Sequence, residues 1–544
     1  MSLSNDSRYP RTDRMHRPWA TSSLGAVGLL ALVVSGSSVG GCQPPGDPYA
    51  CGSANGAVGG EAGAGAHEPP GGAGGEGGAA GLPPAPVPAA PAPPDLTVVS
   101  SDDYASDIQI AVHDKVNTLL VVSWKQTRAA TATWLEFWLD GEPHMTSRPG
   151  TGGLGDHRDV VLGVPGDAEV TVRVVSQSGQ TAYASSEQRL RTLPVPSGMP
   201  VPRILSYTPE LSSPDRWLFG SVEDSAGGSP YSYYLRTFWL YIMDRQGRIV
   251  WYYADPASNA TTSFQRRARD GAYIVFEKRC YGCGGYAESI VKMTLDWDTF
   301  EEIPVSGIAD AIDVTSDGSL LYDAKSELRE RAADGRDRAL WSCREHFGRA
   351  FNCYTNTINW DAARDSVLMS YPYMGTVVEI DRKQGTLLAQ YGNAKNSFEF
   401  APPLSTPPSA WKFEFQHFPN LTPSGSLLVS SHMPGCSRTE QPVANQHAFV
   451  EFDVDRTEQR LIEKWRYTDG PEWPRAKGMA IRLANGNTLA NYGTGGVIRE
   501  ITPGKATAWH VKFDVPEGDD FFNKMVGHNE LIDDLYALNG QPEP

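Results

Sequence analysis

The sequence is short of positive charge, and this shortage limits its partners. Lys and Arg together number 47 in 544 residues against 64 Asp and Glu, so the formal net charge is −17 at pH 7. The charge is spread along the chain and leaves no basic face, which excludes nucleic acid as a partner. Aromatic residues make up 10% of the chain, a composition that suits an all-β protein better than a helical one.

Cysteine is also scarce, with seven in the chain. The pair Cys280-Tyr-Gly-Cys283 lacks a second Cys-x-x-C or His-x-x-His pair, so a zinc site there is the weaker alternative, and we predict no metal and no cofactor. In an exported protein the cysteines would lie where disulfides persist. The nearest pairings are Cys280 with Cys283 and Cys343 with Cys353, although spacing does not determine connectivity.

The N-terminal segment carries the parts of an export signal. Arginines precede the apolar run Leu24–Val34, which is too short to span a bilayer comfortably. The following Val39-Gly-Gly-Cys42 resembles the lipobox of bacterial lipoproteins, which implies a signal peptide over residues 1–42 and lipidation of Cys42. Gln43 is not the Asp linked with inner-membrane retention in such proteins. We therefore expect an exported lipoprotein at the outer membrane or cell surface, held by its lipid alone, with the periplasmic side and plain secretion as alternatives.

Two segments separate this signal from the larger repeat region. Residues 43–95 are almost all Gly, Ala, Pro and Glu, which predicts a disordered tether because such a stretch buries too little apolar surface to fold. Residues 96–197 show short strand patterns, among them Leu119–Trp124, Thr133–Leu139 and the alternating Ala168–Val175. They resemble a fibronectin type III or immunoglobulin-like sandwich, which would serve as a spacer or docking module.

From residue 198 to 544 one phrase recurs, and this repeat predicts the fold. One half of it is a polar turn between two strands, as in Thr315–Tyr322, Thr422–Val429 and Leu483–Leu489. Its spacing of roughly 45–60 residues is typical of four-stranded blades around a channel. We predict an all-β chain: a β-sandwich followed by a six-bladed β-propeller, with Asp533–Leu538 as the strand that seals the last blade to the first.

One copy of the phrase, Trp411–His432, carries a histidine where the other copies do not. Gln416 and His417 are expected on a loop that enters an innermost strand, at the channel mouth where propellers usually bind their ligands. A neutral imidazole there can act as a base, a nucleophile or a metal ligand. A lone loop histidine is more often a polar contact, so the residue alone does not define the chemistry.

Three runs of the propeller segment carry a family resemblance. They are Val378-Glu-Ile-Asp-Arg-Lys-Gln-Gly, Phe415-Gln-His-Phe before the Pro-Ser-Gly turn, and Gly478-Met-Ala-Ile-Arg-Leu-Ala-Asn-Gly. Over most of residues 205–540 the chain resembles the bacterial arylsulfotransferases, which are six-bladed propellers. The resemblance implies that His417 takes the sulfuryl group of an aryl sulfate covalently and passes it to a phenol, without a metal or soluble cofactor, and that Asn356 donates a hydrogen bond to the sulfate.

The chain departs from the family pattern around the expected sulfate. Tyr354 replaces the histidine of His-x-Asn, Ile312 replaces the histidine of His-Asp, and Ser370–Tyr373 lacks the expected arginine. Each lost donor would cost about 2–4 kcal/mol, by analogy with oxyanion-hole variants. The candidate replacements are Tyr354, Tyr373, His432, Arg438 and His447, and the candidate channel carboxylates are Asp310 and Asp313.

Two functions follow from these observations. The first is an exported arylsulfotransferase-like enzyme for small phenolic or aryl sulfate substrates, with His417 as nucleophile and Asn356, Tyr354 and His432 as substrate-binding residues. The second is a non-catalytic surface lipoprotein whose propeller binds a glycan, a peptide or an envelope protein. The repeated tryptophan motifs of quinoprotein dehydrogenase propellers are absent, so that class receives no support.

Overall fold

The computed structural model describes residues 96–223, 238–253, 260–261, 265–268, 272–280, 287–324, 326–401, 414–432, 447–468, 477–513 and 525–540. The chain divides into two compact units, residues 1–50 and 51–544, and every described residue belongs to the second. The predicted signal peptide, Cys42 and the tether lie outside the described residues, as do Arg438 and Cys283. Among the residues that are described, no helix is long and apolar enough to cross a membrane.

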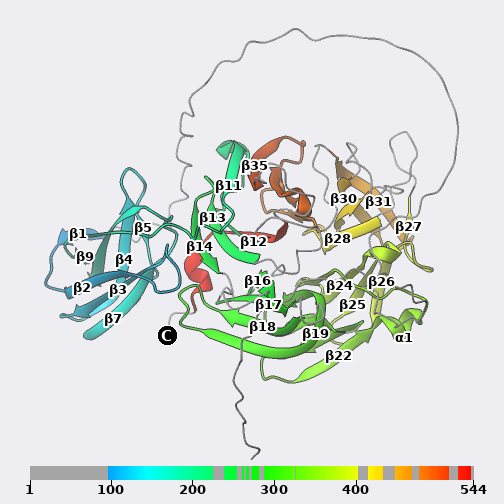
Figure 1. Ribbon diagram of the computed structural model, residues 1–544, viewed down its shortest axis with the longest axis horizontal. Coiled ribbons are helices and arrows are strands. Elements are labelled where there is room, and N and C mark those ends of the chain that lie inside the picture. Colours follow the sequence, from blue (N-terminus) through cyan, green and yellow to red (C-terminus); the bar gives the residue numbers. More distant parts are fainter. Residues whose placement is uncertain are drawn as a thin grey trace, which may run out of the picture. The chain divides into compact units, whose positions relative to one another are not determined.

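The first described segment folds into two sheets that pack face to face as a β-sandwich (Figure 1). Its strands are β1 (Thr97–Ser100), β2 (Ala105–Val112), β3 (Leu120–Gln126), β4 (Ala130–Leu139), β5 (Met145–Thr146), β6 (Gly150–Gly152), β7 (Gly155–Val161), β8 (Glu169–Ser178), β9 (Thr181–Ala184) and β10 (Gln188–Arg191). One sheet runs β2-β3-β7, and the other runs β1-β9-β8-β4-β5 with β10 on β8 and β6 on β4. Val122 and Trp124 of one sheet meet Phe137 and Val172 of the other, because alternate strand residues point to the same face. The sandwich is present, and its kinship with fibronectin type III domains stays a prediction.

Five sheets follow in the described residues, and one of them continues through β19 from one blade into the next, so together they form six blades of four main strands each. Blade 1 contains β36 (Val526–Ile532), β12 (Trp217–Glu223), β13 (Phe238–Asp244) and β14 (Ile249–Tyr253). Blade 2 contains β16 (Gln265–Arg267) with β15 (Ala260–Thr261), β17 (Ile274–Cys280), β18 (Ala287–Met293) and the first part of β19 (Phe300–Val314). Blade 3 contains the rest of β19, β20 (Leu320–Ala324), β21 (Glu327–Arg331) and β22 (Asp337–Ser342). Blade 4 contains β23 (Thr357–Asp361), β24 (Ser366–Tyr371), β25 (Thr376–Asp381) and β26 (Leu387–Gly392). Blade 5 contains β28 (Glu414–Leu421), β29 (Leu427–His432), β30 (His447–Asp455) and β31 (Arg460–Tyr467), with β27 (Glu399–Phe400) at its edge. Blade 6 contains β32 (Met479–Arg482), β33 (Thr488–Asn491), β34 (Val497–Ile501) and β35 (Thr507–Phe513), with β11 (Pro202–Tyr207) at its edge.

The six blades close into a ring. The outer strand of a blade leads into the innermost strand of the next, as β19 shows: its residues up to Ile308 pair with β18 and those from Ile308 onward pair with β20. The innermost strands contact one another in the order β36, β16, β19, β23, β28 and β32, and blade 6 returns to β36 through β33. The predicted six-bladed propeller is confirmed.

The ring is sealed by a strand earlier than the one predicted. β36 pairs with β12 in blade 1, with Trp217 opposite Ile532 and Phe219 opposite Glu530. The segment Asp533–Leu538 does not form a strand: it contains the short 3-10 helix η6 (Leu535–Leu538), whose start is capped by the Asp534 side chain. The prediction of a sealing strand was therefore right in kind and wrong in position.

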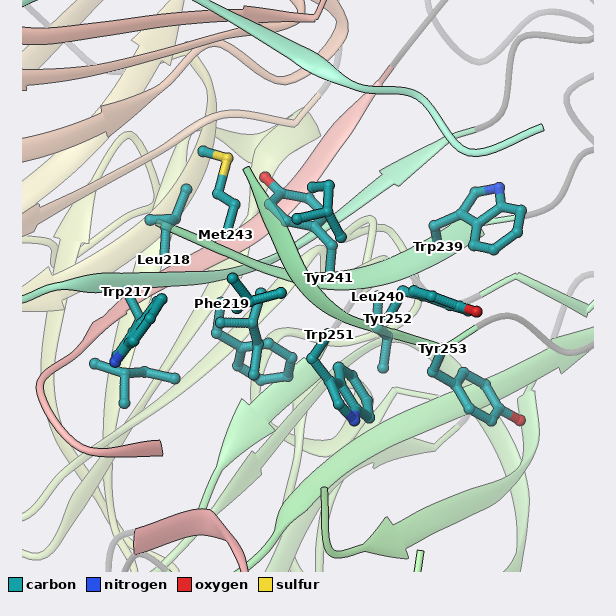
Figure 2. Packing of buried hydrophobic residues seen from close by; sticks show 14 of the residues in the cluster. Trp217, Leu218, Phe219, Trp239, Leu240, Tyr241, Met243, Trp251, Tyr252 and Tyr253 are labelled. Atoms are coloured by element: carbon teal, nitrogen blue, oxygen red, sulfur yellow. The ribbon is translucent and has the colours of Figure 1, made fainter. Parts of the chain in front are cut away.

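Blade 1 is built on large aromatic side chains, as Figure 2 shows. Phe219, Tyr241 and Trp251 are fully buried there. The Trp251 indole N–H donates to the Leu295 carbonyl at 2.9 Å, so this polar atom is satisfied in the core. Gly220 leaves room for these rings, since a Cβ at its position would clash with the side chains of Tyr241 and Asn529. Each buried aromatic contributes about 1.5–3 kcal/mol to stability.

The sandwich shares a core with blade 1 and the C-terminal segment. Leu119 and Leu162 belong to the same buried cluster as Trp217 and Tyr252. Polar contacts surround this shared core. In two of them the sandwich donates to blade 1: Asn117 N to Tyr252 Oη at 2.9 Å and Thr118 Oγ1 to Val250 O at 2.8 Å. In the other two the sandwich accepts: Val160 O from Tyr536 Oη at 2.9 Å and Glu142 Oε1 from Arg248 Nη1 at 2.5 Å. We call this contact region the junction.

One predicted disulfide is present. Cys343 and Cys353 are bonded, which links the short helix α1 (Cys343–Phe347) to the loop before β23. The other predicted pair, Cys280 with Cys283, lies outside the described side chains. The bond anchors the chain three residues before Asn356, so it bears directly on the position of a predicted site residue.

Candidate functional site

His417 lies inside strand β28, which corrects the prediction that it lies on the loop before it. β28 pairs with β29 at Glu414 opposite His432 and at His417 opposite Ser430, with shifts of register on both sides of His417. The extra residues are accommodated at Phe415 and Phe418, whose φ angles of 48° and 51° lie in the left-handed region that bulky residues rarely adopt. Such strained residues cluster at functional sites and persist only when their surroundings hold them.

Blade 4 holds this irregular segment in place. Gln416 is fully buried, and its carbonyl accepts hydrogen bonds from Asn356 Nδ2 at 2.9 Å and from Ser370 Oγ at 3.1 Å. On the other side of His417, the Phe418 amide donates to Thr357 Oγ1 at 3.0 Å. Residues of β23, β24 and the turn before β23 thus restrain the backbone both before and after the histidine.

Asn356 also determines which ring nitrogen of His417 carries the proton. Its Nδ2 lies 3.0 Å from His417 Nδ1 and donates to the Gln416 carbonyl, while its Oδ1 accepts from Thr357 Oγ1 at 3.3 Å. Because a carbonyl only accepts, the amide nitrogen must face both Gln416 and His417. Nδ1 of His417 is therefore an acceptor, and the neutral ring carries its proton on Nε2.

Three partly exposed aromatic rings accompany this histidine. The Tyr354 and Tyr373 rings are 5.6 Å apart, and the Tyr373 ring meets Phe415 edge to face at 5.9 Å. Tyr354 and Phe415 each stand two residues before Asn356 and His417, so the same two segments supply the rings and the polar pair. We call His417, Asn356, Gln416, Tyr354, Tyr373 and Phe415 the His417 site.

The two other histidines predicted here lie deeper. His432 is 1% exposed, with its ring 6.1 Å from Phe415 and 6.0 Å from His447. His447 Nε2 lies 2.8 Å from Ser430 Oγ. Burial, and then the charge of His432, hold the pKa of His447 well below its ordinary value, so this ring is neutral at pH 7. His447 therefore does not replace the missing cation, and substrate binding by His432 stays a prediction.

Asp313 has a different environment from the one predicted for a channel carboxylate. It is 1% exposed, its Oδ2 accepts from the Trp360 amide at 2.7 Å, and its Oδ1 lies 3.4 Å from Nε of Arg266. Arg266 also donates to Asn359 Oδ1 at 3.2 Å. Arg266 was not predicted from the sequence, where its only signal is an arginine pair on a strand of three residues. The side chain of Asp310, the other predicted channel carboxylate, lies outside the described part.

A second polar pair on an innermost strand was also missed. His528 Nε2 donates to Glu530 Oε1 at 2.7 Å, and its ring lies 4.8 Å from that of Phe418. Burial, and then the Arg266 charge, lower the pKa of His528 to about 4, so the ring is neutral at pH 7. The His-x-Glu spacing on a strand, which places both side chains on one face, was the available signal.

No metal centre accompanies these residues: in the described ranges, no group of three His, Cys, Asp or Glu side chains could hold an ion. No family model matches the chain, and no curated protein matches it. The arylsulfotransferase resemblance therefore has no support from these comparisons.

Several solved structures resemble the chain weakly. A catalytically inactive virginiamycin B lyase from Staphylococcus aureus, solved with quinupristin, is 10% identical with a TM-score of 0.34, over 61% of this chain and 99% of that one. A putative 6-phosphogluconolactonase from Bacteroides uniformis is 13% identical with a TM-score of 0.32, over 73% and 98%. Hsv2p from Kluyveromyces lactis is 10% identical with a TM-score of 0.29, over 69% and 95%. All are β-propeller-like proteins, and likeness at this level carries no argument about function.

Proposed function

We propose that the protein binds a neutral glycan at the His417 site without transforming it. The observation that carries this proposal is the pair of hydrogen bonds from Asn356 Nδ2 to Gln416 O and His417 Nδ1. It makes Nε2 of the neutral His417 ring a hydrogen-bond donor, which suits the hydroxyl and ring oxygens of a sugar.

The same geometry disfavours nucleophilic attack by this histidine. A histidine that accepts a sulfuryl group needs a lone pair on the attacking nitrogen, and here the lone pair is on Nδ1, where Asn356 occupies it. A lone pair on Nε2 would require a proton on Nδ1, directed at the Asn356 N–H group. The positions that supply histidine or arginine in arylsulfotransferases are Ile312, Tyr354 and the segment Ser370–Tyr373, which contain no cation.

The surroundings of His417 also favour an uncharged ring-shaped ligand. Tyr354, Tyr373 and Phe415 offer aromatic surface, and the two tyrosines add hydroxyl groups. The chain as a whole carries a net charge of −17, which opposes the approach of an anion. We further propose that binding takes place outside the cell membrane, on a protein anchored through Cys42; the lipobox-like sequence supports this placement.

Glycan binding can be tested with the full chain on a glycan array, followed by calorimetry with the glycans retained. We expect His417→Ala to weaken binding about tenfold or more, because it removes a fixed donor. His346→Ala is the matched control, since His346 is an exposed histidine of α1 in the same propeller. Absence of glycan binding, or equal binding by the wild type and His417→Ala, would contradict the proposal.

Sulfuryl transfer is the second candidate, and one observation favours it. His417 and Asn356, the two positions that match the arylsulfotransferase pattern, lie side by side with Nδ1 and Nδ2 3.0 Å apart. In that reaction His417 would form a bond to sulfur while the aryl oxygen leaves, and a phenol would then take the sulfuryl group. Incubation with a chromogenic aryl sulfate and a phenol tests it: no transfer, or transfer unaffected by His417→Ala, would exclude it.

Asn356→Asp separates the two candidates. A carboxylate beside Nδ1 accepts a proton there and moves the lone pair of the neutral ring to Nε2. We expect this variant to lose glycan affinity and to fold less stably, because the carboxylate cannot donate to Gln416 O. Both N–H groups of Asn356 are directed at Gln416 O and His417 Nδ1, so a sulfate would lose no donor in this variant. If sulfuryl transfer is the function, the variant would therefore keep or increase its transfer rate.

A further inference from the structure

A cavity of about 290 Å³ lies at the junction, between sandwich residues and the C-terminal segment. Its lining includes Trp124, Arg148, His157, Arg158, Asp159 and Tyr536. The volume is just below the range of about 300–1,000 Å³ that is usual for small-molecule sites, so it suits a ligand of one ring. None of the residues of the His417 site lines it.

The two arginines of this cavity use only part of their donor capacity. Arg148 donates from Nη2 to Asp534 at 2.9 Å, and Arg158 donates from Nη1 to the two oxygens of Asp298 at 3.1 and 2.9 Å. A guanidinium carries five N–H groups. Arg248, at the same junction, instead uses all three of its nitrogens, on Glu142 and Asp244. Arg148 and Arg158 therefore each have two guanidinium nitrogens that donate to no described residue, whereas each of the three Arg248 nitrogens donates a hydrogen bond.

The rest of the lining is ordered before any ligand enters. The rings of Trp124 and His157 stack at 5.3 Å, and His157 Nε2 lies 2.7 Å from the Gly153 carbonyl. Asp159 accepts from Ser147 Oγ at 2.5 Å and from the Val160 amide at 2.7 Å. Each of the two carboxylate oxygens retains a further acceptor site. The cavity thus presents fixed acceptors beside the donors of the two arginines.

The charges in and around the cavity nearly cancel, which points to an uncharged ligand. Arg148 and Arg158 face Asp534 and Asp298, so the carboxylate of Asp159 is the remaining charge. An anion would meet Asp159, and a cation would meet two guanidinium groups. A polyhydroxylated ring can bind both the arginine donors and the Asp159 carboxylate, because each hydroxyl donates one hydrogen bond and accepts others.

We propose that the junction cavity binds a neutral sugar ring, one monosaccharide unit, through the remaining N–H groups of Arg148 and Arg158 and the carboxylate of Asp159. The site is separate from the His417 site and does not rest on the function proposed there. It gives the sandwich a role in ligand recognition in place of a purely spacing role.

Saturation-transfer NMR on the full chain tests this proposal with the methyl glycosides of glucose, galactose, mannose and N-acetylglucosamine. We expect saturable binding of at least one glycoside in both the wild type and His417→Ala, and a loss of affinity of about tenfold in Asp159→Asn and in Arg148→Gln. Glu142→Gln is the matched control, because it weakens the junction through Arg248 without lining the cavity.

The proposal would be overturned by saturable binding of none of the four glycosides, by unchanged affinity in Asp159→Asn, or by equal losses in Asp159→Asn and Glu142→Gln. Thermal unfolding of each variant shows whether it is folded. We expect Asp159→Asn to fold, because it keeps an oxygen that can accept from Ser147. Loss of binding in His417→Ala alone would assign the signal to the other site and would also overturn the proposal. Failure here leaves the glycan-array result for the His417 site standing.

Discussion

Two histidines on innermost strands of the same propeller have opposite environments. His528, on β36 of blade 1, has a side chain 2% exposed and donates to the carboxylate of Glu530. His417, on β28 of blade 5, is partly exposed and accepts from the amide of Asn356. Phe418 separates them: it follows His417 in the chain, and its ring lies 4.8 Å from that of His528.

The difference shows why a reactive histidine is hard to identify from its residue type. Catalysis by histidine requires both access to the substrate and a partner that leaves a lone pair on the attacking nitrogen. His528 has a carboxylate partner but is buried. His417 is accessible but has an amide partner. These environments support a role of His528 in the stability of the fold, and they are the basis for proposing that His417 contacts the ligand.

The largest expected effect comes from breaking the buried polar cluster beside His528. Arg266→Met leaves the carboxylate of Asp313, 1% exposed, without its cation, and we expect a loss of about 3–5 kcal/mol in the free energy of unfolding. Urea unfolding monitored by tryptophan fluorescence measures it. Arg336→Met is the control, because Arg336 and Asp334 form an exposed ion pair that contributes little to stability. A loss as small as the control's would show that the cluster does not stabilise the fold.

The second-largest expected effect is on the pH dependence of the free energy of unfolding. The pKa of His528 is about 4 in the folded protein and 6.5 ordinarily, so the unfolded chain binds the proton first as the pH falls. The neutral His528 therefore adds its full contribution to the free energy of unfolding above about pH 6.5, and this contribution is lost as the pH decreases toward 4. Between pH 7.5 and 5 we expect the wild type to lose about 2 kcal/mol more than His528→Gln, measured by urea unfolding at each pH. Equal losses in the two proteins would contradict the buried, neutral state of His528.

The smallest expected effect on stability is that of His417→Ala. The Asn356 amide keeps its bond to Gln416 O, and the side chain removed is only partly buried, so we expect a change below about 1 kcal/mol in the free energy of unfolding. The same variant should lose ligand affinity, whereas the effect predicted for His528→Gln is on the pH dependence of stability. A loss of several kcal/mol in His417→Ala would mean that both histidines serve the fold.

The sequence predicted the architecture well because the repeat expresses it directly. Each polar turn between two apolar strands marks a blade, and the count of six follows from the spacing of the turns. The sealing strand was misplaced because Val526–Ile532 carries Gly, His, Asn and Glu between its apolar ends, whereas Asp533–Leu538 contains the run Leu-Tyr-Ala-Leu. Only pairing with β12, more than 300 residues earlier, distinguishes them.

The site was predicted less completely, for a physical reason. His417 and Asn356 were identified, but the direction of the hydrogen bond between them depends on the Gln416 carbonyl, which no sequence pattern reveals. Arg266 and His528 were missed because charged or titratable side chains on strands usually face solvent. Their burial follows from the closed ring, which places the innermost strands against one another.

The protonation of His417 is the most direct test of these assignments. Nitrogen chemical shifts of the full chain, labelled with ¹⁵N-histidine at pH 8, report it, and the His417→Ala spectrum identifies the signals. We predict a protonated Nε2 and an unprotonated Nδ1 for His417. A protonated Nδ1 with a lone pair on Nε2 would contradict the role of Asn356 and would make His417 a nucleophile.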